Sequence, residues 1–174
     1  PKDMRNDVCV TMTVMSLDPD NSAEIAGMNG ASLAIAMSDI PWKGPIAGVA
    51  VGLVDGQIVL NPTKEQRERS DLALTLAASM DKIVMIEAGA NEVDEATMME
   101  AIKTGHAEIK KMLAFINGIV AEIGKPKIDF QSVDLDYDLL KKISAAHLDE
   151  FKAAMDTDDK NVRDAALLPI MDKI

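Results

Sequence analysis

The chain has 174 residues, 48% of them hydrophobic and 27% charged, and its 29 acidic and 18 basic side chains give a formal net charge of −11. This length fits one domain, or one domain with part of another, and the composition excludes an intrinsically disordered chain. The single cysteine excludes an internal disulfide framework and a cysteine-based zinc site. The acidic balance speaks against a protein that wraps nucleic acid over its whole surface, because phosphate contacts need clustered Lys and Arg.

We expect neither a membrane span nor a signal peptide in these residues. No apolar run reaches the roughly 18 residues that a membrane span needs, and residues 1–7 are too polar for a signal peptide. We therefore expect a cytoplasmic protein with no membrane partner. The chain begins at Pro1 rather than Met, from which we expect a fragment or a processed product.

The first 40 residues predict a strand followed by a helix. Apolar residues recur with a period of two over 8–17, which indicates a strand covered on both faces and places Cys9 inside it as a buried, inert thiol. Residues 22–38 are rich in Ala and Gly and predict a helix buried against a sheet. We expect Asn21 to cap this helix, with Glu24 reaching back as in a capping box.

Two hairpins follow in the sequence. Residues 46–54 and 57–60 flank Asp55-Gly56, and Asp-Gly between apolar runs is typical of a type I′ turn. The alternating run 72–77 and the run 83–86 predict a second hairpin. Because four apolar residues are consecutive in 83–86, we expect the second strand of this hairpin to be the more buried.

The longest helix is predicted from Asp94 to Ile123. Asp94 is a good N-cap residue, and apolar residues recur with a period near 3.6 from Met98 onwards. Gly124 and Pro126 end the helix. The part of the chain up to residue 132 is therefore expected to be an α+β layer of sheet and helices.

The last 42 residues have a different composition. A short extended linker, 126–132, leads to a segment from Val133 that we expect to be all-helical, with a break at 156–159 and a kink near Pro169. Its two helices offer little apolar surface. We therefore place a domain boundary between 1–132 and 133–174 and interpret the second part as the start of a larger helical domain.

A search for catalytic groups finds no constellation. His106 and His147 lie 41 residues apart without a motif, and both are better explained as packed structural side chains. Asp18 and Asp20 could bind a hard cation, but Asp-Pro-Asp-Asn before a helix is typical of turn and cap chemistry. The acidic run 156–159 is most simply a solvated turn.

The glycine-rich and basic stretches are also better explained by structural roles than by ligand binding. Residues 27–32 are no phosphate-binding loop, because they lack a lysine and lie inside the predicted helix. Lys64, Arg67 and Arg69 alternate with Glu65 and Glu68, which favours a solvated turn over an RNA contact. From the residues alone we therefore assign no catalytic, cofactor-binding or metal-binding residue.

Several short motifs of the sequence resemble the first RNase PH-like core domain of the bacterial polynucleotide phosphorylase family. No single motif is decisive, but their order and spacing together are specific. The resemblance runs from about residue 6 to 132, and the tail fits the all-helical domain that joins the two core domains of that family. The motifs are Asn29-Gly30-Ala31-Ser32-Leu33-Ala34, Ile40-Pro41, Gly44-Pro45-Ile46, Val59-Leu60-Asn61-Pro62-Thr63, Met85-Ile86-Glu87, Met99-Glu100-Ala101-Ile102, Gly105-His106 and Gly124-Lys125-Pro126.

The resemblance implies a function for a longer parent enzyme. Members of the family degrade RNA from the 3′ end with inorganic phosphate, release nucleoside diphosphates, use Mg²⁺ and form homotrimeric rings. Such phosphoryl transfer depends on groups that hold the phosphate and neutralise its charge. The partners implied for the parent are RNA, inorganic phosphate, two further copies, and the second core domain of the same chain.

The resemblance also implies that this segment is a degenerate copy of the active domain. The active copy carries a phosphate-binding serine run and an Asp-x-Asp-x-Lys strand. The matching stretches here are Ser22-Ala23-Glu24 and Asp71-Leu72-Ala73-Leu74-Thr75. Glu24 would repel phosphate, and Ala73 and Thr75 replace the catalytic Asp and Lys, so a single remaining carboxylate, Asp71, cannot replace the set. We expect no Mg²⁺ in this segment and a scaffold role.

The family's first core domain also has an N-terminal half with an arginine-rich loop, and the family has KH and S1 domains. None of these is in the 174 residues, so we expect an exposed sheet edge that favours self-association. Two alternatives remain open at this point: a non-catalytic RNase PH-like ring subunit of an exosome-type complex, and an acidic protein-interaction module.

Overall fold

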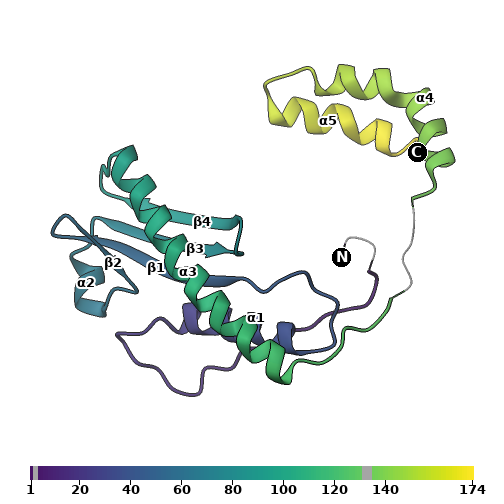
Figure 1. Ribbon diagram of the computed structural model, residues 1–174. Coiled ribbons are helices and arrows are strands. Elements are labelled where there is room, and N and C mark those ends of the chain that lie inside the picture. The colour runs from purple at the N-terminus through teal and green to yellow at the C-terminus, as the bar shows by residue number, and fades with distance from the viewer. Residues whose placement is uncertain (2–3, 131–134) are drawn as a thin grey trace. The chain divides into compact units, whose positions relative to one another are not determined.

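The computed structural model describes residues 1, 4–130 and 135–174 and divides into two compact units (Figure 1). The first unit comprises residues 1–130 and the second residues 131–174. Within the described ranges, none of the helices combines the length and the apolar character that crossing a bilayer requires. The expected boundary at 132/133 falls on residues outside the described ones, and the domain assignment stays a prediction.

The core of the first unit is a four-stranded antiparallel sheet in the order β2-β1-β3-β4. The strands are β1 (Ala47–Val54), β2 (Gln57–Leu60), β3 (Leu72–Ala78) and β4 (Ile83–Ala90). Asp55 and Gly56 have φ angles of 50° and 76°, as a type I′ turn requires, so the first predicted hairpin is confirmed. The pairing of β3 with β4 confirms the second.

Burial within the second hairpin is the reverse of the prediction. Leu72, Leu74 and Leu76 of β3 are fully buried, whereas seven of the eight residues of β4 are exposed. The reason is position in the sheet, because β3 lies between two strands and β4 is an edge strand. An apolar run cannot distinguish these two places.

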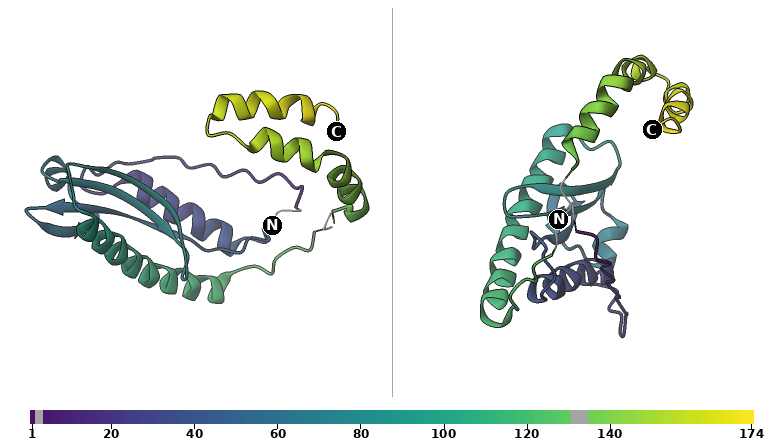
Figure 2. Two further views of the ribbon diagram at one scale, coloured as in Figure 1. Left: turned by 90° about the horizontal axis from the view of Figure 1, so that it is seen from above. Right: turned by 90° about the vertical axis from the view of Figure 1, so that its right-hand side faces the viewer.

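Helix α3 (Glu95–Ile123) covers one face of the sheet (Figures 1 and 2). Its apolar stripe buries Ile109, Leu113 and Ile116 against the strands, as the periodicity predicted. Asp94 is its N-cap and accepts a hydrogen bond from the Thr97 amide at 3.0 Å. Hydrogen bonds from the Thr97 hydroxyl and amide lower the pKa of the Asp94 carboxyl.

Helix α1 (Ala23–Met37) begins one residue later than predicted. Its N-cap is Ser22, whose hydroxyl accepts from the Ile25 amide at 3.3 Å. Asn21 is not the cap, because its side-chain amide donates to Asp18 Oδ2 at 2.6 Å. The helix packs against β1 and α3.

Residues 8–17 do not form the predicted strand. They are exposed throughout, and Figure 2 (left) draws them as extended chain beside α1. Cys9 is therefore exposed rather than buried. An alternating sequence becomes a strand only where a partner strand pairs with it, and none of the described residues does so here.

The second unit is a pair of helices, α4 (Tyr137–Met155) and α5 (Lys160–Met171). Asp136 and Asp159 cap them, and the break at 156–159 lies where it was predicted. Pro169 lies inside α5, and its kink stays a prediction. Residues 131–134, which include part of the predicted linker, lie outside the described residues.

Candidate functional site

The main hollow of the first unit, about 720 Å³, is lined by the N-terminus of α1, by β1 and β3, and by α2 (Lys64–Glu68). One residue of α3, Met112, also lines it. The lining contains both donors and acceptors. Its polar and charged members are Asp18, Asn21, Ser22, Glu24, Asn29, Asn61, Lys64, Arg67, Ser70 and Thr75.

Two side chains of α1 serve as hydrogen-bond partners for the edge of β1 where β2 no longer reaches. The Asn29 amide donates to the Gly48 carbonyl at 3.0 Å and accepts from the Gly48 N–H at 2.8 Å. Ser32, only 3% exposed, accepts from the Ile46 N–H and donates to the Ile46 carbonyl. These two side chains therefore stand in for a neighbouring strand, since an unpaired buried backbone group is costly.

Asn61 extends this arrangement towards β2. Its side-chain oxygen accepts from the Ala50 N–H at 3.1 Å, and its own N–H donates to the Ala50 carbonyl at 2.7 Å. Its φ of 47° lies in the left-handed region, which Asn tolerates better than most residues. The sequence motifs that contain Asn29, Ser32 and Asn61 are thus explained by structure, because these side chains form hydrogen bonds with the backbone at the edge of β1.

Arg67 holds together the loops at the mouth of the hollow. Its guanidinium donates to the carbonyls of Pro62 and Pro19, residues 43 positions apart in the chain. Lys64 and Arg69 form exposed ion pairs with Glu68 and Asp55. Each member of the basic cluster therefore has a protein partner, but Lys64–Glu68 is the short helix α2 with Thr63 as its N-cap, and not the solvated turn that we expected.

The carboxylates of the acidic residues before α1 accept hydrogen bonds from backbone N–H groups of the turns around them. Asp18 Oδ1 accepts from the Asp20 N–H at 3.0 Å, and Asp20 Oδ1 accepts from the Lys64 N–H at 3.0 Å. The hydrogen bond from the Asp20 amide, followed by that from the Asn21 side chain, lowers the pKa of the Asp18 carboxyl. This is turn and cap chemistry, as the sequence indicated.

The two stretches matched to the family's active copy meet in this hollow. Ser22 and Glu24 line it from α1, and Ala73 and Thr75 line it from β3. Asp71 does not belong to the lining. Its backbone instead continues the sheet, with its N–H donating to the Leu53 carbonyl and its carbonyl accepting from the Asn91 N–H.

The residues of the hollow do not fit Mg²⁺. Within the described ranges, no group of three or more His, Cys, Asp or Glu side chains is arranged to hold a metal ion. Of the two carboxylates in the lining, Asp18 already accepts from Asp20 and Asn21. A hard cation prefers several oxygen ligands, and Glu24 with neutral hydroxyls and amides is a poor set.

The two histidines belong to different units of the fold. His106 Nε2 is 3.0 Å from the Ser79 carbonyl, so the ring links α3 to the turn between β3 and β4. His147 belongs to α4 in the other unit, with Nδ1 buried and 4.0 Å from Glu150 Oε2. Neither lines the main hollow.

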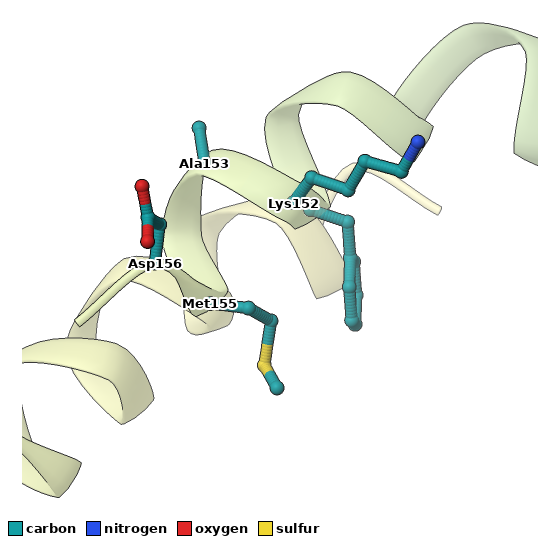
Figure 3. Close-up of a pocket in the computed structure, with 5 residues that line it drawn as sticks. Lys152, Ala153, Met155 and Asp156 are labelled. Atoms are coloured by element: carbon teal, nitrogen blue, oxygen red, sulfur yellow. The ribbon is translucent and has the colours of Figure 1, made fainter. Parts of the chain in front are cut away.

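A second hollow, about 530 Å³, lies at the C-terminal end of α4 (Figure 3). It is lined by Phe151, Lys152, Ala153, Met155 and Asp156, all from one stretch of chain. The labelled side chains diverge, with Lys152 and Asp156 pointing to opposite sides. Such a surface offers no converging polar groups for a ligand.

Sequence reasoning missed the roles of several polar residues. Lys127 Nζ donates to the carbonyls of Ile35, Ala36 and Ser38, and so caps the C-terminus of α1 from the segment after α3. A lysine in a Gly-Lys-Pro-Lys stretch carries no local signal for this contact. For Asn29 the signal existed, because Asn inside a helix is unfavourable without a specific hydrogen bond.

The comparisons with known proteins agree with this fold. Residues 44–108 match the model of the 3′ exoribonuclease family, domain 2. Among solved structures, the rice protein Rrp46 is similar with a TM-score of 0.54 and 16% identity, over 60% of this chain and 51% of that one. At this identity the likeness concerns the fold alone, which is that of an RNase PH C-terminal domain.

Curated relatives match nearly the whole chain. A polyribonucleotide nucleotidyltransferase of Ruminiclostridium cellulolyticum is 53% identical over 165 residues, which cover 95% of this chain and 24% of the relative. The enzyme of the same name from Macrococcus caseolyticus is 48% identical over 177 residues, which cover 100% of this chain and 25% of the relative. The chain thus spans about a quarter of the length of the relatives it matches.

Proposed function

Because this chain is a segment of the polynucleotide phosphorylase family with an RNase PH-like fold, we propose that it is the non-catalytic structural copy of the core domain in a phosphorolytic 3′-to-5′ exoribonuclease. The observation that carries the proposal is the lining of the main hollow. Glu24, Ala73 and Thr75 line it, and these are the residues that the resemblance matches to the phosphate-binding and charge-bearing groups of the active copy.

The chemistry of phosphoryl transfer explains why this lining is unsuited to the reaction. Phosphate must be held by donors, and the charge that develops during transfer must be neutralised by a metal or a lysine. Glu24 adds negative charge where phosphate would bind, and Ala73 and Thr75 bear none. Arg67, a cation of the lining, already donates to two backbone carbonyls.

The hydrogen bonds around the hollow support a scaffold role. Asn29, Ser32 and Asn61 use their polar groups to complete the edge of β1. The parent enzyme that we propose is a cytoplasmic homotrimer. It degrades RNA with inorganic phosphate and Mg²⁺ at the second core domain of the same chain, while this segment supports the ring.

A replacement experiment tests the proposal. The matching segment of the Ruminiclostridium cellulolyticum enzyme is exchanged for this chain, and release of nucleoside diphosphate from poly(A) with phosphate and Mg²⁺ is measured. We expect the chimera to retain activity and a deletion of the segment to abolish it. Activity that survives the deletion would contradict the scaffold role.

The chain alone provides the control for catalysis. Under the same conditions we expect no nucleoside diphosphate above the level of a no-protein blank. Release of nucleoside diphosphate by the pure chain would show that the segment is itself catalytic.

A further inference from the structure

We propose that residues 124–128 form a strap that fastens the start of the connection between the two units to the C-terminal end of α1, and that Lys127 is the positioning residue that locks this strap. Two observations lead to the inference. The end of α1 needs hydrogen-bond donors that its own sequence does not supply. The segment after α3 supplies them, with Lys127 acting on a carbonyl 91 positions earlier in the chain.

The C-terminal end of α1 is short of donors. A helix leaves its last four carbonyl groups without partners inside the helix, and its dipole places negative partial charge there. In α1 the Ser38 N–H donates to the first two of these carbonyls, those of Ala34 and Ile35. The last turn contains no basic side chain. The carbonyls of Ala36 and Met37 therefore need donors from water or from another part of the chain.

The side chain of Lys127 meets this need. Its ammonium group donates to three carbonyls at the helix end, at 3.2, 2.8 and 2.6 Å, those of Ile35, Ala36 and Ser38. An ammonium group has three N–H donors, so these bonds use its full capacity. Hydrogen bonds from a charged donor are also stronger than neutral ones. Lys127 thus provides both the cap and the compensating charge that α1 lacks.

Backbone hydrogen bonds hold the strap on both sides of the lysine. The Lys125 N–H donates to the Met37 carbonyl, and the Ile128 N–H donates to the Asp39 carbonyl, each at 2.8 Å. Between them, Pro126 has no N–H that would need a partner, and the residue before a proline favours the extended conformation. The local sequence is therefore suited to an extended run along the end of α1.

Gly124 directs the chain into the strap as it leaves α3. Its φ of −68° and ψ of 145° are open to any residue, so the backbone conformation does not require glycine. A Cβ atom at this position would instead overlap the carbonyl oxygen of Val120, a backbone atom of α3 that cannot move aside without distorting the helix. The motif Gly124-Lys125-Pro126 is thus explained by a close turn, a backbone donor and an extended residue in succession.

The strap changes where the connection to the second unit begins. Helix α3 ends at Ile123, but the chain stays bonded to the first unit as far as Ile128. Extended chain covers at most about 3.6 Å per residue, so detachment of residues 124–128 would lengthen the connection by up to roughly 18 Å. Lys127 therefore limits how far the connection can reach.

Amide hydrogen exchange followed by NMR tests the strap at single residues. Lys127→Met keeps an unbranched side chain but removes its donors. We expect it to speed exchange of the amides at positions 125 and 128 at least about tenfold, because hydrogen bonds from a charged group are lost. Lys125→Met is the matched control, since the Lys125 side chain has no partner among the described residues, and it should leave both rates unchanged.

Chemical rescue separates the ammonium group from a general loss of packing. In a Cys9→Ser background, which removes the exposed native thiol, Lys127→Cys is alkylated either with bromoethylamine, which restores an ammonium group, or with iodoacetamide, which adds a neutral one. Only the first should restore slow exchange at positions 125 and 128. Equal rates in the two products, unchanged rates in Lys127→Met, or equal acceleration of the β3 amides in that variant would overturn the proposal.

Discussion

At the scale of single residues, Gly105 decides how closely α3 approaches the sheet. A Cβ atom at this position would lie 3.0 Å from Leu76 Cδ2 and 3.1 Å from Val51 Cγ2. The absence of a side chain therefore lets the helix cross β1 and β3 at short range. At Gly118, on the same helix, an added Cβ atom would have no neighbouring atom within 4 Å.

Substitution at these two glycines should have opposite effects. Gly105→Leu overfills the contact with the sheet and should lower the free energy of unfolding by about 1–3 kcal/mol. Gly118→Leu places a better helix former at an exposed site and should raise it by up to about 1 kcal/mol. Urea unfolding followed by circular dichroism measures both, and equal changes in the two variants would contradict the close approach at Gly105.

At the scale of secondary-structure elements, α1 contacts the edge of β1 in an unusual way, through polar side chains. A helix normally meets a sheet through apolar side chains on its face, but here Asn29 and Ser32 replace a missing strand. The segment after α3 adds a further contact, because Lys127 caps α1 and the Lys125 N–H donates to the Met37 carbonyl. Polar groups thus hold helix α1 to the core at its middle and at its C-terminus.

Removal of the Asn29 side chain should weaken this contact. Asn29→Ala leaves the N–H and the carbonyl of Gly48 without partners, which should lower the free energy of unfolding by about 1–3 kcal/mol. Asn117→Ala on the exposed side of α3 is the control, and Ala is the better helix former there. A loss in Asn29→Ala no greater than in the control would show that water satisfies Gly48 equally well.

At the scale of the whole molecule, the two units differ in how much apolar surface they bury. In the first unit a contiguous core joins β1, β3 and α3. In the described part of the second unit, Ala154 and Ile170 are the buried hydrophobic residues, while Leu148, Phe151 and Leu168 are exposed. Local stability follows such burial, so the two units should open at different free energies.

Hydrogen–deuterium exchange should reveal this difference. We expect backbone amides of α4 and α5 to exchange at least about a hundredfold faster than those of β3 and of the central turns of α3. Mass spectrometry of peptic peptides provides the comparison within one sample. Equal protection of α5 and β3 would mean that the second unit is stabilised by contacts other than those between its two helices.

The sequence by itself determined the elements whose signals are local. The Asp55-Gly56 turn, the capping of α3 by Asp94 and the 3.6-residue period of α3 depend on neighbouring residues, and each was predicted in place. The order of the short sequence motifs along the chain also indicated the family. This comparison of motifs needs no knowledge of tertiary contacts. The absence of charged groups at Ala73 and Thr75 could likewise be read directly from the chain.

Only the tertiary structure decided what depends on partners remote in sequence. All three apolar stretches predicted strands, yet 8–17 is exposed and pairs with none of the described residues, β3 lies in the core and β4 forms an edge of the sheet. It also took the structure to bring Ser22 and Glu24 to the same hollow as Ala73 and Thr75, and Lys127 to the end of α1. The physical reason is that burial and strand pairing require two surfaces in contact. A sequence pattern describes one of these surfaces and does not identify the other.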